Sequence, residues 1–183
     1  MDTTTQERAA LSPSTPLNIG ELNAKFGRLS EAFATVAEHA VRAGLRYEAG
    51  GRGLDGQGVD GFGFLRMCCM AVAGRQLHDL AGYAGWPHRE PRETRVANLL
   101  DDWGLTIVGD HTFTDLRRGD VAVFVPNPHQ PGPAGEIVVA GATQDRPALV
   151  AACWAPDAPR IQPYRARYDG RIMVRVYRWV EAS

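Results

Sequence analysis

The chain has 183 residues, 44% of them hydrophobic, and carries 20 basic against 21 acidic side chains. This length is enough for one domain with a hydrophobic core but short for two. The near-neutral charge excludes the strong positive field that draws proteins to nucleic acid or to anionic membranes. We therefore expect one globular unit that binds no nucleic acid.

Targeting signals and the number and spacing of the cysteines narrow the class of protein further. No run of 18 apolar residues is present, and the first eight residues lack the basic start and apolar centre of a signal peptide. The three cysteines are too few for a disulfide framework, and no Cys/His pair has the spacing of a zinc site. The sequence predicts a protein made in the cytoplasm, without membrane insertion, with reduced thiols and with neither metal nor cofactor.

The first third of the chain predicts an arm followed by a helix. Residues 1–20 are rich in Thr, Ser and Pro and predict a flexible arm, whereas residues 21–183 are expected to form the domain. Ser30 precedes a run of helical apolar spacing over residues 31–43, and Gly44 follows it. An N-cap residue, the spacing and a terminal glycine together predict a helix here.

A glycine-rich turn over residues 58–63 leads into an apolar segment that ends near Ala73. The glycines permit unusual backbone conformations, and the apolar spacing predicts a buried helix. Free N–H groups at such a helix start lower a thiol's pKa and stabilise an oxyanion, so enzymes favour the place for a nucleophile. The helix is expected from about Gly63 to Ala73. Asp60, ahead of it, has no acidic partner, which favours a structural role over that of a general base.

The remaining sequence predicts one more helix and then strands. Residues 82–95 form a loop with Trp86, and residues 94–102 a short helix followed by Trp103. Strands are expected over residues 105–108, 120–125, 136–140, 148–153 and 171–180. Helices first and strands later predict an α+β domain, with the helices packed on an antiparallel sheet of about five strands.

Four segments resemble the NlpC-type, papain-like cell-wall cysteine peptidases, and their bacteriophage-tail and gene-transfer-agent branch in particular. Residues 40–51 are similar to the lead-in that ends in a tyrosine and paired glycines, and residues 60–64 to the nucleophile turn. Residues 74–83 resemble a segment of the phage-tail branch, and residues 116–124 its Gly-Asp strand. The likeness spans roughly residues 35–180 and implies the papain-like fold.

The resemblance also implies a catalytic triad whose positions are vacant in this chain. Gly61 stands where the family has its nucleophilic cysteine, Ala134 where it has the histidine base, and Ala151 where a polar residue orients that base. No Ser or Thr lies in the turn to replace the thiol. Loss of a whole catalytic unit leaves only what binding contributes, which indicates a pseudoenzyme.

Two alternatives remain open. Cys68 or Cys69, with His78 or His129, is the fallback nucleophile of an active peptidase or amidase, although seven residues place Cys68 about 10 Å along the helix from Gly61. The other alternative is a peptidoglycan-binding module. Its candidate groove residues are Tyr47, Asp60, Trp86, Trp103 and His129.

The preferred hypothesis is an inactive structural or assembly protein of a phage-type tail tip, in the hub or baseplate region. The resemblance implies a product of the bacterial cytoplasm that enters a virion or phage-like particle. Its expected partners are other tail-tip proteins and, in the binding-module alternative, peptidoglycan.

Overall fold

The computed structural model describes residues 29–53, 58–79, 92–110, 112–126, 129, 135–141, 148–151, 157–165, 167–168 and 171–180. Within these residues the chain has an α+β architecture, as the sequence predicted. The helices are α2 (Leu29–Arg42), α3 (Gly61–Ala73) and α4 (Arg92–Asp102). The strands are β1 (Leu105–Asp110), β2 (Val121–Pro126), β3 (Gly135–Gly141), β4 (Ala148–Ala151), β5 (Arg160–Pro163), β6 (Arg167–Tyr168) and β7 (Arg171–Trp179).

The strands form one antiparallel sheet in the order β1-β7-β2-β3-β4-β5, with β6 paired to β7. The five strands expected from the sequence are all present. Strands β5 and β6 were not predicted, because β5 has four residues of mixed polarity that end at Pro163 and β6 has only two residues. The long strand β7 crosses to lie between β1 and β2, so the end of the chain holds the sheet together.

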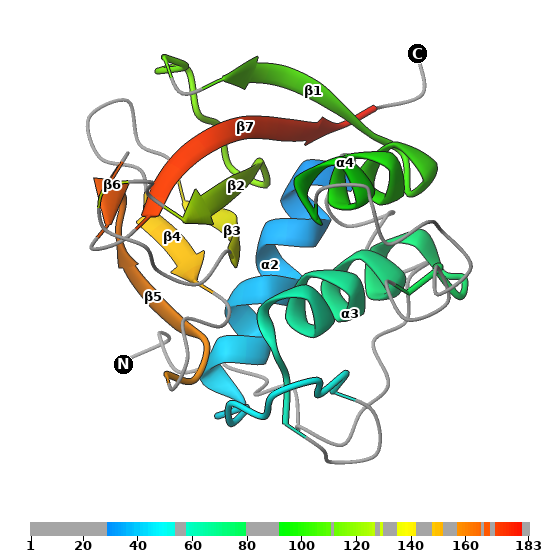
Figure 1. Ribbon diagram of the computed structural model, residues 1–183. Helices are drawn as coiled ribbons and strands as arrows, with labels where there is room; N and C mark the ends of the chain where they lie inside the picture. The colour runs from blue at the N-terminus through cyan, green and yellow to red at the C-terminus, as the bar shows by residue number, and fades with distance from the viewer. Residues whose placement is uncertain are drawn as a thin grey trace, which may run out of the picture.

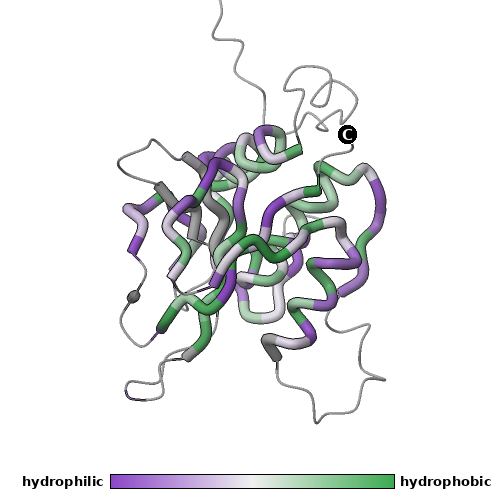
Figure 2. Tube along the Cα trace, turned by 90° about the horizontal axis from the view of Figure 1, so that it is seen from above, coloured by the Kyte–Doolittle hydropathy of each residue, from purple (hydrophilic) through white to green (hydrophobic). Residues whose placement is uncertain are grey.

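The sheet curves around α2, which lies at the centre of the molecule (Figure 1). Helix α2 contacts β3, β4, β5 and β7 on one side and α3 on the other, while α3 also packs on β3 and α4 packs on β1. Hydrophobic segments run through the middle of the molecule, and hydrophilic ones lie more at its periphery (Figure 2). The predicted packing of helices on an antiparallel sheet is therefore present.

The main hydrophobic core fills the space between the helices and the concave face of the sheet. Phe33 of α2 meets Trp179 of β7 edge to face, with ring centroids 5.6 Å apart. A smaller core lies on the opposite face of the sheet, where Phe124 and Met173 are covered by Leu116. Of the helices in the described residues, none is long and apolar enough to cross a membrane.

The ends of the helices follow local chemistry, with one correction. Ser30 was predicted to be the N-cap of α2. The helix begins at Leu29, however, so Ser30 lies within its first turn. Its predicted end is correct to one residue, since Gly44 adopts a left-handed conformation with φ 74°. The expected arm of residues 1–20 lies outside the described residues.

The Gly-Asp turn before β2 joins the sheet to α2. A Cβ built at Gly119, where φ is 87°, would overlap the carbonyl group of Ser30, so only glycine permits this approach. The Asp120 side chain is fully buried and accepts hydrogen bonds from Arg178 Nε and Nη2, at 2.7 and 2.8 Å, and from the Arg117 backbone N–H. This hydrogen bonding raises the pKa of the Arg178 guanidinium. The motif thus has a structural role.

Candidate functional site

The candidate site is the turn that precedes α3, and its backbone is tightly paired. Val59 forms bridges with both Tyr47 and Arg52, through hydrogen bonds that include Glu48 N to Val59 O and Val59 N to Arg46 O. The Glu48 carboxylate accepts a hydrogen bond from the Gly58 N–H at 2.8 Å. The described part of the glycine-rich lead-in is therefore held by hydrogen bonds beside the start of α3.

Asp60 is the N-cap of α3, which begins at Gly61 rather than at the predicted Gly63. Its extended backbone turns the chain into the helix, and its Oδ1 accepts a hydrogen bond from the Gly63 N–H at 2.6 Å. This satisfies one of the free N–H groups of the first turn and places a negative charge at the positive end of the helix. The first helical residue, where the resemblance expects the nucleophile, is Gly61.

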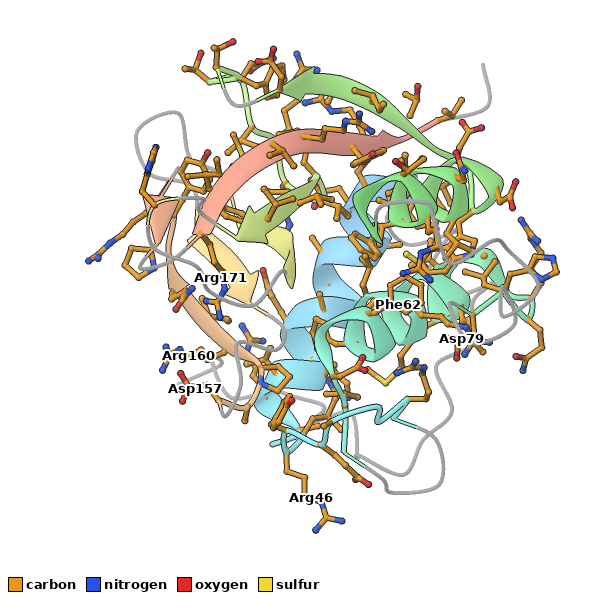
Figure 3. All side chains as sticks on the ribbon, viewed as in Figure 1. Arg46, Phe62, Asp79, Asp157, Arg160 and Arg171 are labelled. Carbon is orange, nitrogen blue, oxygen red and sulfur yellow. The ribbon has the colours of Figure 1, made fainter. Side chains whose placement is uncertain are left out.

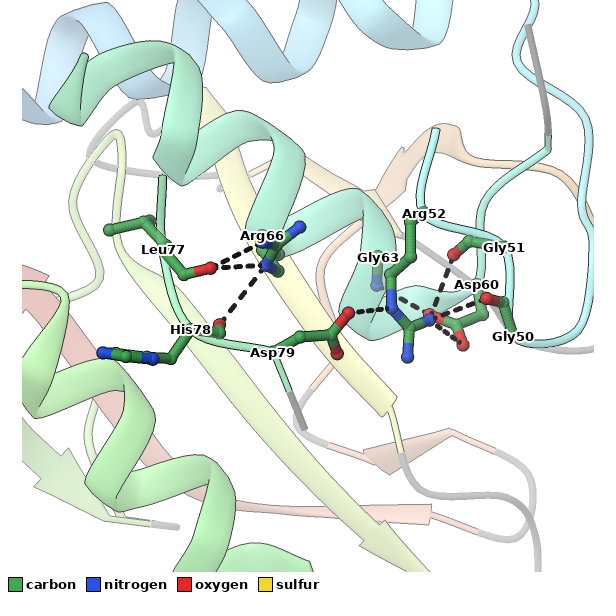
Figure 4. Close-up of polar contacts among 9 residues, drawn as sticks. All are labelled: Gly50, Gly51, Arg52, Asp60, Gly63, Arg66, Leu77, His78 and Asp79. Atoms are coloured by element: carbon green, nitrogen blue, oxygen red, sulfur yellow. Dashed lines mark hydrogen bonds and ion pairs between the residues drawn. The ribbon is translucent and has the colours of Figure 1, made fainter. Parts of the chain in front are cut away.

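Arg52 joins three segments around this cap (Figure 4). Its Nη1 donates to Asp60 Oδ2 at 2.8 Å and to the carbonyl groups of Gly50 and Gly51, and its Nε donates to Asp79 Oδ2 at 2.7 Å. The guanidinium also lies 5.9 Å from the centroid of the Phe62 ring. Partial burial opposes the charge, but the hydrogen bonds to Asp79 and Asp60 outweigh it and raise the pKa of Arg52.

The segment that carries Asp79 is fixed by a second arginine. Arg66 of α3 donates from Nη2 to the Leu77 carbonyl oxygen at 2.5 Å and from Nε to the carbonyl oxygens of Leu77 and His78. Gly74 ends α3 in the left-handed conformation, which turns the chain back along the helix. The segment from Gly74 to Asp79 thus closes α3 and returns Asp79 to the helix start.

The fallback nucleophiles are core residues. Cys68 and Cys69 have no exposed surface, and desolvation raises the pKa of both thiols above the ordinary range. Since the thiolate is the reactive form, this environment disfavours nucleophilic chemistry at either sulfur. They belong to the hydrophobic core with Phe64, Leu65 and Val72 of the same helix.

Of the expected base and orienting positions, only the orienting one lies within the described residues. Ala134 lies outside the described residues, directly before β3, which begins at Gly135. Ala151 is the last residue of β4 and pairs with Ile137 of β3. Because the strands are antiparallel, the start of β3 at Gly135 and the end of β4 at Ala151 lie at the same end of the β3–β4 pair, and α3 packs on β3.

One of the proposed groove residues lies in the hydrophobic core. Trp103 is 2% exposed and packs on Phe62, with ring centroids 5.4 Å apart, so the sequence expectation of a ligand-stacking Trp103 is corrected to a core role. Tyr47 is half-buried and His129 is exposed in the turn after β2. Trp86 lies outside the described residues.

Sequence reasoning missed the two arginines that organise the site. Arg52 contacts carboxylates that are eight and 27 residues away, and Arg66 contacts carbonyl groups 11 and 12 residues away. No periodicity or motif spacing links such positions. Within the described residues, no group of three or more His, Cys, Asp or Glu side chains is placed to hold a metal ion.

Comparisons of the chain with protein families, with curated proteins and with solved structures find no match. The NlpC-type resemblance therefore rests on the motifs in the sequence.

Proposed function

We propose that this protein is a catalytically inactive NlpC-like, papain-like domain that serves as a structural or assembly component of a phage-type tail tip. The observation that carries the proposal is the identity of the first residue of α3. A nucleophile at the start of this helix would use its free N–H groups and dipole, and Gly61 has no side chain to offer.

The residues that the motifs retain support a preserved scaffold. Asp60 caps α3, Gly74 ends it, and Gly119 and Asp120 bind the sheet to α2 and to β7. Each of these residues has a structural contact that does not depend on catalysis. The positions that the resemblance assigns to chemistry hold only Gly61, Ala134 and Ala151.

The burial of both cysteines argues against the active-peptidase alternative. Cys68 and Cys69 are fully buried, and their raised pKa values keep both thiols protonated at neutral pH. The peptidoglycan-binding alternative loses one of its stacking surfaces, because Trp103 packs inside the core. No observation on the described residues specifically favours either alternative.

The test is a peptidoglycan-digest assay on the native chain and on a Gly61→Cys/Ala134→His/Ala151→His triple variant. The matched control is the Gly61→Ser/Ala134→His/Ala151→His variant, which has the same bulk but no thiol. We expect a silent native chain, weak cleavage by the cysteine variant and none by the serine variant. Circular dichroism and denaturation of each variant establish that it is folded.

Cleavage by the native chain would contradict the proposal. If that cleavage resisted Cys68→Ala and Cys69→Ala, the chemistry would lie elsewhere in the chain. If either substitution abolished it, the active-peptidase alternative would replace the present one. The assembly role is tested separately by mass spectrometry of purified tail particles, in which the chain should be found with hub proteins at a fixed ratio.

A further inference from the structure

The backbone of Gly50–Arg52 lies directly on the first turn of α3. A Cβ built at Gly63 would overlap the Gly51 carbonyl oxygen and would lie 3.1 Å from the Cα of Arg52. The Asp60 N–H donates to the same carbonyl oxygen at 3.1 Å. Gly61, Phe62 and Gly63 are all buried at this turn, although they begin the helix whose start the sequence expected to line a groove.

The side chain of Arg52 fastens this backbone on both sides. It binds Asp60 on the helix side and Asp79 on the far side, and its guanidinium lies over the Phe62 ring. The contacts involve a charged donor and two charged acceptors, which makes them stronger than neutral hydrogen bonds. Arg52 therefore holds its own segment and the segment of Asp79 against the helix start.

We propose that Gly50–Arg52 is a strap that covers the first turn of α3, and that the side chain of Arg52 holds this strap in place. The side chains of Arg52 and Asp79 are 21% and 22% exposed, so water competes for their contacts and the strap opens without unfolding the core. A ligand reaches the N–H groups of the first turn only when Arg52 leaves Asp60 and Asp79. This inference goes beyond the proposed function, because closure does not depend on whether the chain catalyses a reaction.

The experiment measures access to position 61 directly. A Gly61→Cys variant is treated with iodoacetamide at neutral pH, and mass spectrometry follows alkylation of the peptide that contains position 61. The same substitution is combined with Arg52→Ala, or with Arg46→Ala as the matched control. Arg46 is exposed and projects away from the body of the molecule (Figure 3), so its removal leaves the strap intact.

We expect Arg52→Ala to speed alkylation at position 61 about tenfold, which corresponds to about 1.4 kcal/mol, and Arg46→Ala to leave the rate within about twofold. Loss of a nearby positive charge raises a thiol's pKa and slows alkylation, so an increase reports access. Cys68 and Cys69 in the same samples serve as internal standards. Their alkylation stays slow if the core remains closed.

A milder variant guards against misfolding. Asp79→Asn leaves the Asp60 cap in place and removes the negative charge from one of the two ion pairs of Arg52, so it should speed alkylation at position 61 by a smaller factor. Amide hydrogen exchange of Phe62 and Gly63 without the engineered cysteine should rise in the same order of variants.

Two results would overturn the proposal. In one, Arg52→Ala and Arg46→Ala give equal rates at position 61; in the other, the Gly61→Cys variant alone reacts as fast as a free thiol. Both readouts are independent of peptidase turnover, so this inference and the proposed function fail separately.

Discussion

Replacing Asp120 by alanine should lower the free energy of unfolding by about 3 kcal/mol. The Asp120 carboxylate has no exposed surface, accepts two hydrogen bonds from Arg178 and takes a third from the Arg117 N–H. Because it joins the turn before β2 to β7, its loss weakens the contact between two neighbouring strands of the sheet.

The magnitude follows from the different exposure of the two partners. Removing one member of a buried ion pair costs about 3–5 kcal/mol when the other member stays dry. The Arg178 side chain is 22% exposed and also donates to the Asp115 carbonyl oxygen, so water and this contact compensate for part of the loss. The expected loss of unfolding free energy is therefore about 3 kcal/mol, at the lower end of that range. It corresponds to a fall in Tm of about 6–12 °C.

The assay is urea unfolding followed by circular dichroism, with Asp115→Ala as the matched control. Asp115 lies in the same turn, but its side chain is 64% exposed and its ion pair with Arg117 should contribute less than about 1 kcal/mol. A double variant, Asp120→Ala/Arg178→Met, should recover part of the loss, because it leaves no charged group without its partner. If Asp120→Ala costs no more than Asp115→Ala, the carboxylate does not hold the sheet to the turn and the reasoning fails.

Two further predictions concern α3. Gly63→Ala should lower the free energy of unfolding by about 2–4 kcal/mol, since the new Cβ meets the rigid Gly51 backbone. The control Gly44→Ala, whose Cβ has nothing within 4 Å, should lower it by about 1–2 kcal/mol because of its left-handed conformation. Equal losses in urea unfolding would contradict the close packing at Gly63. Burial raises the pKa of Cys68 and Cys69, so above the ordinary thiol pKa of 9.0 the unfolded chain binds fewer protons than the folded one. Stability should then fall with rising pH by up to about 1.4 kcal/mol per unit for each thiol, and the Cys68→Ala/Cys69→Ala variant, measured beside the native chain between pH 8 and 10, should lack this part of the slope.

The relation between the Gly-Asp turn and the rest of the fold illustrates what a motif can and cannot predict. Its position before a strand was predicted correctly, because a glycine turn followed by an apolar run is local information. Its partner, Arg178, lies 58 residues away on a strand that crosses back between β1 and β2. That contact depends on strand order, which residue spacing does not encode.

By itself the sequence determined the α+β class, the helix that ends at Ala73 and the five strands β1, β2, β3, β4 and β7, because glycines and apolar periodicity act over a few residues. It also indicated that Gly61 leaves the helix start without a nucleophile. Only the tertiary structure decided that Trp103 is a core residue and that Arg52 closes the first turn of α3. Burial and long-range ion pairs arise when distant segments pack together, so they are properties of the folded chain rather than of any local pattern.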